Sequence, residues 1–461
     1  MAQFFNEPGS NVYIVATMGF RTRLQPDIVK PILMQFFVKH PRFSSLQVEN
    51  KETGELNWIP IDVDLEKHVI VPDLDPNMDG ADQFVEDYVS NLSKTKMVNS
   101  KPQWEVHLLN VKTSDAEAVA IYHIHHSIAD GMSLLALVLA HSRQVSNPSA
   151  SPTLPGAMNR KFSYRKLGDF VSILYVLWNT LVAVFMFVLT ALFLKDTPTP
   201  LKGPPGVELK PRRFVRRTIN LQDFKLVKNA LDCTINDVVL GVTQAGLSRY
   251  LNRRYGELQN DAGVSLEEKK RKNYLPKNIR FRAAFFFNLR ASTKINAVSG
   301  TIKEGTKTGK FGNKIGYVIL PLNIGIRDDP LDYVRQAKAA IDRKKASLEP
   351  LLTYLFLKFF IKFFGVKAAG VFSSKIFRNT TLWFSNVPGP REEISFDGHQ
   401  VTYSSCTCYG QPSALLIHVI SYSDKISFVL STDEDTIPDP HSLCDDLEES
   451  LKLIKAAAKL C

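Results

Sequence analysis

The sequence has few cysteines for its length, five in 461 residues. A sparse, odd-numbered set argues against a disulfide framework and favours a reducing compartment. Cys406 and Cys408 are not spaced like a zinc-binding pair, and no second pair matches them. We therefore expect both to be ordinary strand residues.

Other features are also lacking. The first twenty residues have no basic stretch followed by a sustained apolar core, so no signal peptide is predicted. No fixed-period repeat is present, which argues against a solenoid or propeller. There is no aromatic-rich RNA signature and no DNA-reading motif. The formal net charge of +11 therefore favours an anionic membrane surface or a polyanionic cofactor over nucleic acid.

The chain is too long for one ordinary core, and two lobes are the natural expectation. With 44% hydrophobic and 22% charged residues it is a folded protein. Strand and helix patterns alternate in both halves, which predicts a mixed α/β (α+β, two-layer) fold. We place an N-terminal lobe at 1–155, a linker with a long apolar segment at 156–205, and a C-terminal lobe at 206–461.

The apolar segment covers 170–194 and contains no charge. Its length suffices to span a bilayer, which needs roughly 20 apolar residues; a buried core helix is the alternative. One true span would put the two lobes on opposite sides of a membrane. An in-plane helix, or a hairpin turning near Asn179-Thr180, would keep both lobes in the cytosol. A second stretch, 351–377, interleaves Phe and Leu with four lysines and fits either a membrane headgroup boundary or a core helix. The 29 phenylalanines, many of them clustered, also hint at a lipid-facing surface, so we predict membrane attachment.

The most informative stretch is Ala118 to Ser142, which reads as a buried strand, a tight turn and an apolar helix. Alternation along the strand places His126 on one face, with His123 and His125 on the other. Asp130 and Gly131 supply an N-cap and a small first residue for the helix. Because the three histidines face different ways, we predict no metal site. An imidazole at a strand end, with a carboxylate four residues on, is typical of a general base.

The stretch from His125 to Gly131, HHSIADG, resembles the HHxxxDG motif of acyltransferases related to chloramphenicol acetyltransferase. Further landmarks, in order, resemble the wax ester synthase/diacylglycerol acyltransferase family in its plant-type branch: Asn236-Asp237, Asn288-Leu289-Arg290, Gly312-Asn313 and Ser385 to Pro390, SNVPGP. The DFGWG turn of the soluble plant acyltransferases is absent.

The resemblance implies two lobes with a channel at their interface, acyl-CoA entering from one mouth and the alcohol from the other. It implies no bound cofactor or metal; acyl-CoA is a co-substrate. It further implies an endoplasmic reticulum membrane location, or a plasma membrane one, with the lobes facing the cytosol.

The resemblance also assigns roles to individual residues. His126 is the expected general base, with His125 in support. Asp130 holds the turn with Arg290 as its ion-pair partner, and Gly131 leaves room for the pantetheine arm. Lesser expectations are polar support of the site from Asn236 and Asp237, and a substrate channel at Ser385, Asn386 and Gly389.

The predicted function is transfer of a fatty acyl group from acyl-CoA to a long-chain alcohol or to diacylglycerol. An imidazole of ordinary pKa about 6.5 can take the alcohol proton and pass it to the leaving thiolate, so no acyl-enzyme is needed. Two alternatives stay open: a soluble acyltransferase acting on small polar alcohols or amines, and a non-catalytic lipid-binding protein.

Overall fold

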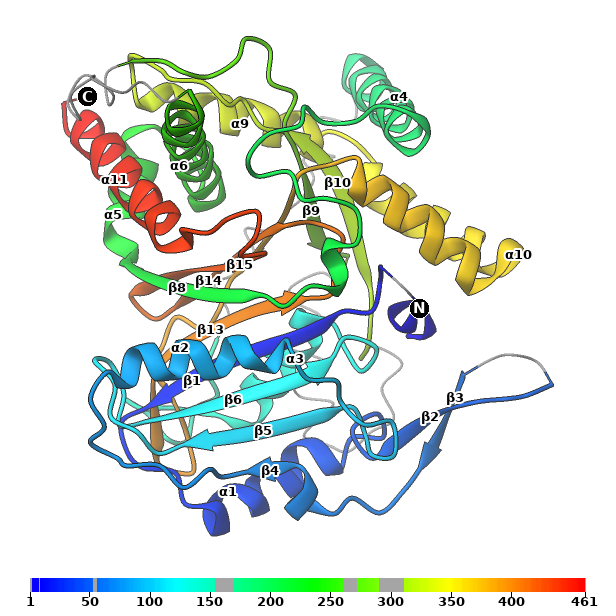
Figure 1. Cartoon of the computed structure of the whole chain (residues 1–461), viewed down its shortest axis with the longest axis vertical. Helices are drawn as coiled ribbons and strands as arrows, with labels where there is room; N and C mark the ends of the chain where they lie inside the picture. Colours follow the sequence, from blue (N-terminus) through cyan, green and yellow to red (C-terminus); the bar gives the residue numbers. More distant parts are fainter. Residues whose placement is uncertain are drawn as a thin grey trace.

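The computed structural model describes residues 2–7, 9–52, 56–153, 170–259, 272–289 and 311–460. Within these residues the strands form a seven-stranded sheet, a six-stranded sheet and a two-stranded ribbon. The seven-stranded sheet (the first sheet) has the order β4-β5-β6-β1-β13-β12-β7, and the six-stranded sheet (the second sheet) has the order β10-β9-β11-β14-β15-β8. Figure 1 shows the two sheets one above the other, with the first sheet in the lower half.

The strands of the first sheet and of the β2-β3 ribbon have the following bounds: β1 (Tyr13–Phe20), β2 (Ser45–Glu49), β3 (Leu56–Pro60), β4 (Val69–Ile70), β5 (Trp104–Leu109), β6 (Ala118–His125), β7 (Arg143–Gln144), β12 (Ile394–Phe396) and β13 (His399–Tyr409). Those of the second sheet are β8 (Arg213–Asn220), β9 (Arg282–Asn288), β10 (Ile315–Pro321), β11 (Leu382–Val387), β14 (Leu415–Tyr422) and β15 (Lys425–Thr432).

The α-helices are α1 (Pro26–Leu33), α2 (Ala81–Leu92), α3 (Gly131–His141), α4 (Phe170–Leu192), α5 (Leu221–Ala230), α6 (Ile235–Leu258), α9 (Leu331–Lys345), α10 (Glu349–Arg378) and α11 (Pro440–Ala458). Short helical turns occur at η1 (Gln3–Asn6), η2 (Met34–Val38), η3 (Leu65–Lys67) and η5 (Val207–Leu209). The strand and helix predicted between Ala118 and Ser142 correspond to β6 and α3.

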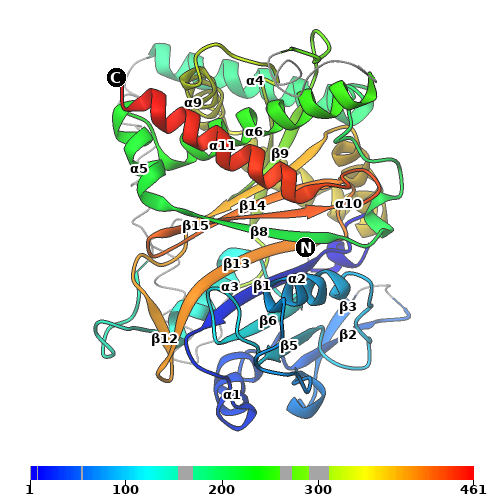
Figure 2. The same cartoon turned by 60° about the vertical axis from the view of Figure 1, so that its left-hand side comes forward.

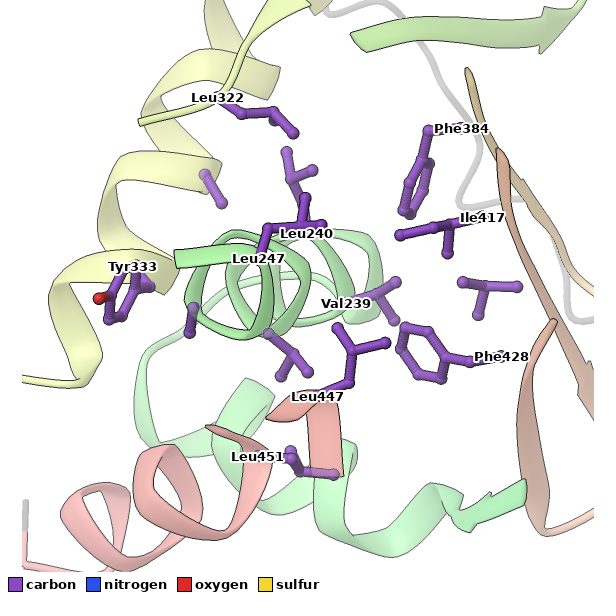
Figure 3. Packing of buried hydrophobic residues seen from close by; sticks show 14 of the residues in the cluster. Val239, Leu240, Leu247, Leu322, Tyr333, Phe384, Ile417, Phe428, Leu447 and Leu451 are labelled. Atoms are coloured by element: carbon purple, nitrogen blue, oxygen red, sulfur yellow. The ribbon is translucent and has the colours of Figure 1, made fainter. Parts of the chain in front are cut away.

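Helices pack on both faces of the first sheet and on one face of the second sheet, where the strands present apolar side chains to them. In the first sheet, α1 and α3 pack on one face and α2 on the other. In the second sheet, α5, α6, α9 and α11 cover one face and form the largest core with residues such as Ile417 and Phe428. Figure 3 shows this core, with α6 side chains Val239, Leu240 and Leu247 in its centre. The other face of the second sheet is left for the first sheet, α4 and α10.

The second half of the chain contributes β12 and β13 to the first sheet, an arrangement that we call the strand exchange. β12 and β13 follow most of the second sheet in sequence, yet β13 pairs antiparallel with β1, with Tyr13 opposite Tyr409 and Gly19 opposite Tyr403. Figure 2 shows β13 lying beside β1. The boundary placed at residue 206 from the sequence does not take account of this exchange. The two halves are therefore interlocked through backbone hydrogen bonds as well as through packing.

The apolar segment forms one uninterrupted helix, α4, so the expectation of a hairpin turn near Asn179-Thr180 is wrong. Both polar side chains hydrogen-bond one turn back instead: Asn179 donates to the Tyr175 carbonyl and Thr180 to that of Val176. The helix therefore absorbs them without breaking. In α10, by contrast, Gly365 has φ 79° and interrupts the helical geometry, a conformation that favours glycine.

A buried ion pair anchors the C-terminal end of α4 to the second sheet. The Arg282 Nε lies 2.6 Å from Asp196 Oδ1, and both side chains are almost fully enclosed. The Arg282 backbone N–H and the Thr381 hydroxyl donate to the other carboxylate oxygen. The guanidinium also donates to the carbonyl of Leu194, just beyond α4. Both charges are thus compensated, which a buried pair requires.

We predict that Asp196→Ala lowers the free energy of unfolding by about 3–5 kcal/mol, because it leaves the Arg282 charge buried without its partner. Urea denaturation measures this change. The control is Arg335→Ala, which breaks exposed pairs to Asp329 and Asp332 and should cost less than about 1 kcal/mol. Equal losses in the two variants would contradict the anchoring role.

Candidate functional site

The end of β6 fixes the position of His126. β6 lies between β1 and β5, with His125 opposite Tyr13 of β1. The His126 N–H donates to the Val12 carbonyl at 2.9 Å, which extends this pairing by one residue. The imidazole is partly exposed and stacks on the Phe5 ring, with ring centres 4.3 Å apart. The backbone of the first sheet therefore sets the place of this ring.

The surroundings of His126 keep its ring neutral. The Nδ1 is buried and has no hydrogen-bond partner among the described residues. Burial lowers the pKa of His126 below its usual 6.5, while the Asp130 charge, the histidine's own carbonyl and the Asn313 side chain act in the opposite direction. A histidine with a lowered pKa is unprotonated at neutral pH and can accept a proton there.

Asp130 ties the turn to two elements. Its Oδ1 accepts a hydrogen bond from the Ser133 N–H at 2.8 Å, which confirms the predicted N-cap of α3. Its Oδ2 accepts from the backbone N–H of Lys314, in the second half of the chain, at 2.9 Å. The expected ion pair with Arg290 stays a prediction, because Arg290 lies outside the described residues.

Residues 311–314 of the second half clamp the histidine turn. Asn313 Nδ2 donates to the His126 carbonyl at 2.9 Å, and the Ser133 hydroxyl donates to the Gly312 carbonyl at 2.9 Å. Gly312 has φ +118°, and a Cβ there would lie 2.7 Å from the Arg42 guanidinium. The GN pair appears in the sequence as a family landmark, but this clamping role was not predicted from it.

His125 supports the turn rather than facing substrate. Its Nδ1 hydrogen-bonds with the Ser127 hydroxyl at 2.7 Å and its Nε2 with Asn11 Oδ1 at 2.8 Å. Burial lowers the pKa of His125 to about 3, so the ring stays neutral at physiological pH. A neutral ring with both nitrogens engaged is a structural element of the turn.

In the described part of the chain, one group of side chains has donor atoms close enough to hold a metal ion: Glu105, His107 and His123, all within 4.8 Å of one another. Lys101 Nζ lies 2.8 Å from Glu105 Oε1, which opposes a second cation at that carboxylate. Hydrogen bonds from the two histidines also hold the pKa of Glu105 well below its usual range. Glu105 is thus a partly exposed carboxylate whose charge is already compensated by its neighbours, and the group fits a metal poorly.

The remaining predicted residues lie elsewhere. Asn236 Oδ1 accepts from Asn386 Nδ2 at 2.6 Å, and Asp237 completes the capping box of α6 with Thr234. No hydrogen bond between described residues joins either Asn236 or Asp237 to His126. Gly389 is needed for space, because a Cβ there would lie 1.9 Å from the Ser421 carbonyl oxygen. The contacts of Asn236, Asp237 and Gly389 among the described residues are local, and their predicted roles at the site stay predictions.

Gly131 lies beside open space, and Ser385 lies on the second sheet. A Cβ on Gly131 would have no heavy atom within 4 Å, which leaves space beside the turn as expected. Ser385 stands on β11 in register with His418 of β14. His418 was not singled out from the sequence, where it appears only as one polar residue in an apolar strand. The environment of His418 becomes visible only in the folded structure.

Among solved structures, the "Wax ester synthase/diacylglycerol acyltransferase from Marinobacter aquaeolei VT8" matches with a TM-score of 0.58 at 18% identity, covering 97% of this chain and 94% of that one. The first condensation domain of the CDA synthetase matches with a TM-score of 0.56 at 11% identity, covering 99% and 93%. These likenesses confirm the predicted two-lobed mixed α/β fold.

The family follows from closer sequence relatives. Two family models match the chain, the "Wax ester synthase/diacylglycerol acyltransferase catalytic domain" at residues 26–239 and the "WS/DGAT C-terminal domain" at residues 311–455. In Arabidopsis thaliana, wax ester synthase/diacylglycerol acyltransferase 11 is 46% identical over 466 residues, covering 99% of this chain and 94% of the relative. The paralogue numbered 3 is 44% identical, covering 99% and 93%. The chain belongs to the wax ester synthase/diacylglycerol acyltransferase family, and its predicted assignment as an acyltransferase of that family is confirmed.

We predict that Asp130→Ala lowers the free energy of unfolding by about 1–3 kcal/mol, because α3 loses its cap and the part-buried Lys314 N–H loses its acceptor. Asp130→Asn keeps one acceptor oxygen and should lose less. Chemical denaturation of both variants measures the difference. Asp64→Ala, which removes the cap of the surface turn η3, is the control and should stay within about 0.5 kcal/mol of the wild type. A loss in Asp130→Ala no larger than in this control would refute the clamp.

Proposed function

We propose that this protein transfers a fatty acyl group from acyl-CoA to the hydroxyl of a long-chain alcohol, or of diacylglycerol, with His126 as the general base. The observation that carries the proposal is the His126 imidazole: it is kept neutral and partly exposed, and both halves of the chain hold it in place. The relatives named as wax ester synthase/diacylglycerol acyltransferases support the choice of substrates.

The reaction follows from the properties of this ring. His126 accepts the proton of the alcohol as its oxygen attacks the thioester carbonyl carbon. The tetrahedral intermediate then collapses, the carbon–sulfur bond breaks, and the imidazolium returns its proton to the leaving CoA thiolate. The Asp130 carboxylate stabilises the transient imidazolium through its charge. Acyl-CoA serves as a co-substrate, and no step needs a bound cofactor.

We expect His126→Ala to lower kcat for ester formation by about 10²–10⁴-fold, because the alcohol then lacks its base. The assay uses purified protein with labelled palmitoyl-CoA and either hexadecanol or diacylglycerol as acceptor. In the wild type, kcat/KM should fall on the acid side with a midpoint below pH 6.5, because burial lowers the pKa of the base.

Folding of the variant is checked by circular dichroism and by its denaturation midpoint. Unchanged palmitoyl-CoA turnover in a folded His126→Ala protein would refute the role of His126 as the general base and favour a lipid-binding protein. Esters formed only with small polar alcohols or amines would favour the soluble-enzyme alternative.

We also propose that α4 and α10 attach the protein to a membrane. One helix among the described residues, α4, is long and apolar enough to cross a bilayer. It lies against α10, with the Phe187 and Phe356 rings 5.7 Å apart, and Figure 1 shows both helices on one edge of the molecule. We call their exposed apolar side chains the apolar edge. It includes Leu174, Trp178, Leu181, Phe185, Val188, Leu355, Phe359, Phe363 and Phe364.

The interlocked fold argues for attachment in the plane of the membrane. α4 connects two halves that pair through β1 and β13, so both halves must lie on the same side of a bilayer. A single span would separate them. In the sequence, 154–169 carries several charges and lacks the run of roughly 20 apolar residues that is typical of a span. Exposed lysines 358, 362, 367 and 375 beside the apolar side chains suit anionic headgroups.

The chemistry of the cysteines supports a cytosolic position. Cys233, Cys406, Cys408 and Cys444 are all free, although Cys406 and Cys408 share one strand, as predicted. We therefore propose that the lobes face the cytosol at the endoplasmic reticulum membrane, or at the plasma membrane.

We expect the combined variant Trp178→Glu/Phe359→Glu/Phe363→Glu to bind vesicles at least about tenfold more weakly, because each buried aromatic side chain contributes roughly 1.5–3 kcal/mol. Sedimentation with vesicles of four parts phosphatidylcholine to one part phosphatidylserine measures this binding. Leu209→Glu is the control, since Leu209 is highly exposed but lies outside the apolar edge. Equal binding by the two variants would refute attachment through α4 and α10.

A further inference from the structure

A second histidine faces the junction between the two halves. On β14, Leu415, Ile417 and Val419 point into the helix-covered core. Side chains alternate along a strand, so Leu416, His418 and Ile420 point to the opposite face. Leu416 lies in a cluster with Val12 and Cys408, which belong to the first half and to its exchanged strand. His418 therefore projects toward the first sheet, where His126 stands.

Two neighbouring contacts place His418 near the histidine turn. Val12, which shares a cluster with Leu416, is the residue whose carbonyl holds the His126 N–H. On β11, Val387 packs against the start of α3, beside Leu135 and Met132. His418 lies two residues from Leu416, and its register partner Ser385 lies two residues from Val387. His418 and Ser385 therefore lie between two contacts: one joins β14 to Val12, and the other joins β11 to the start of α3. Val12 and α3 lie on either side of the His126 turn.

The His418 Nδ1 and the Ser385 hydroxyl have no hydrogen-bond partner among the described residues. The His418 Nδ1 is buried and has no hydrogen-bond partner within the described ranges. Ser385 is partly exposed; its backbone pairs in the ladder with β14, but its hydroxyl makes no hydrogen bond to any residue that the structure describes. Both stand among apolar side chains at the junction, where an unpaired polar group costs free energy unless a ligand pairs with it. Such a position is expected for groups that meet a substrate.

The charge state of His418 suits hydrogen-bond donation. Burial, together with a smaller contribution from the charge of His126, lowers the pKa of His418 to about 3. The neutral ring carries one N–H and does not add a positive charge beside the base. His126, His125 and Asp130 are the titratable groups of the facing turn, and the two histidines are likewise held neutral.

We propose, resting on the acyl-transfer function above, that His418 and Ser385 bind the carbonyl oxygen of the acyl thioester opposite His126. When the alcohol oxygen bonds to the carbonyl carbon, the carbonyl electron pair moves to the oxygen. The His418 N–H and the Ser385 O–H donate to that oxyanion. Its collapse expels the CoA thiolate, which takes the proton that His126 received from the alcohol.

The kinetic test compares His418→Ala, His418→Asn and Ser385→Ala with the wild type. Losing one oxyanion donor typically lowers kcat by 10²–10³-fold, and we expect that loss in His418→Ala with KM for palmitoyl-CoA within about threefold. His418→Asn places an amide N–H near the Nδ1 position and should recover at least tenfold of the loss. The acid limb of the pH profile should not move, since His126 remains the base. His441→Gln, at an exposed site on α11, is the matched control and should leave kcat unchanged.

A binding test separates this inference from the proposed function. We compare the affinity of the protein for S-heptadecyl-CoA, a thioether, and for S-(2-oxoheptadecyl)-CoA, which carries a ketone near the thioester position. The wild type should prefer the ketone, and His418→Ala should lose about tenfold of that preference while keeping its affinity for the thioether.

The outcomes are distinct. If wild-type protein forms esters and His126→Ala does not, but His418→Ala retains kcat within threefold, this inference falls and the proposed function stands. Absence of any ketone preference in the wild type also overturns it. If the ketone preference depends on His418 while no ester forms with either acceptor, the carbonyl site holds and the proposed function fails.

Discussion

The site depends on a contact between residues far apart in the chain: the loop 311–314 closing over the turn after β6. Asn313 and the Lys314 N–H bind the His126 carbonyl and the Asp130 carboxylate, while Val12 holds the His126 N–H from the other side. No single sheet can supply all of these partners. The exchanged strand β13 makes the arrangement rigid, because the two halves cannot shift relative to each other without breaking the β1–β13 ladder.

Burial then sets the chemistry of the junction. It lowers the pKa values of His125, His126 and His418, so three imidazoles stand close together without mutual repulsion. Only His126 has a carboxylate whose charge favours its protonated form, and this difference distinguishes the proton acceptor from its neutral neighbours. One physical cause, loss of solvent, thus gives related side chains different roles.

Local patterns in the sequence predict much of this architecture. The β6 strand, the Asp130 cap, the α4 helix and the strand position of Cys406 and Cys408 all follow from periodicity and capping chemistry. The hairpin expected near Asn179 fails because two polar side chains can bond within a helix. The place of β13 in the first sheet, the clamp by Asn313 and the setting of His418 could not be predicted, because each depends on a distant partner that leaves no local periodicity.

The late position of β13 also constrains how the protein is made. Synthesis proceeds from the N-terminus, and domains generally fold as soon as their strands are available. The ribosome releases α4 well before it has made residues 399–409. The first sheet is therefore still incomplete when this long apolar helix emerges. A nascent chain therefore displays this helix to chaperones and membranes before its own second half can hold it in place.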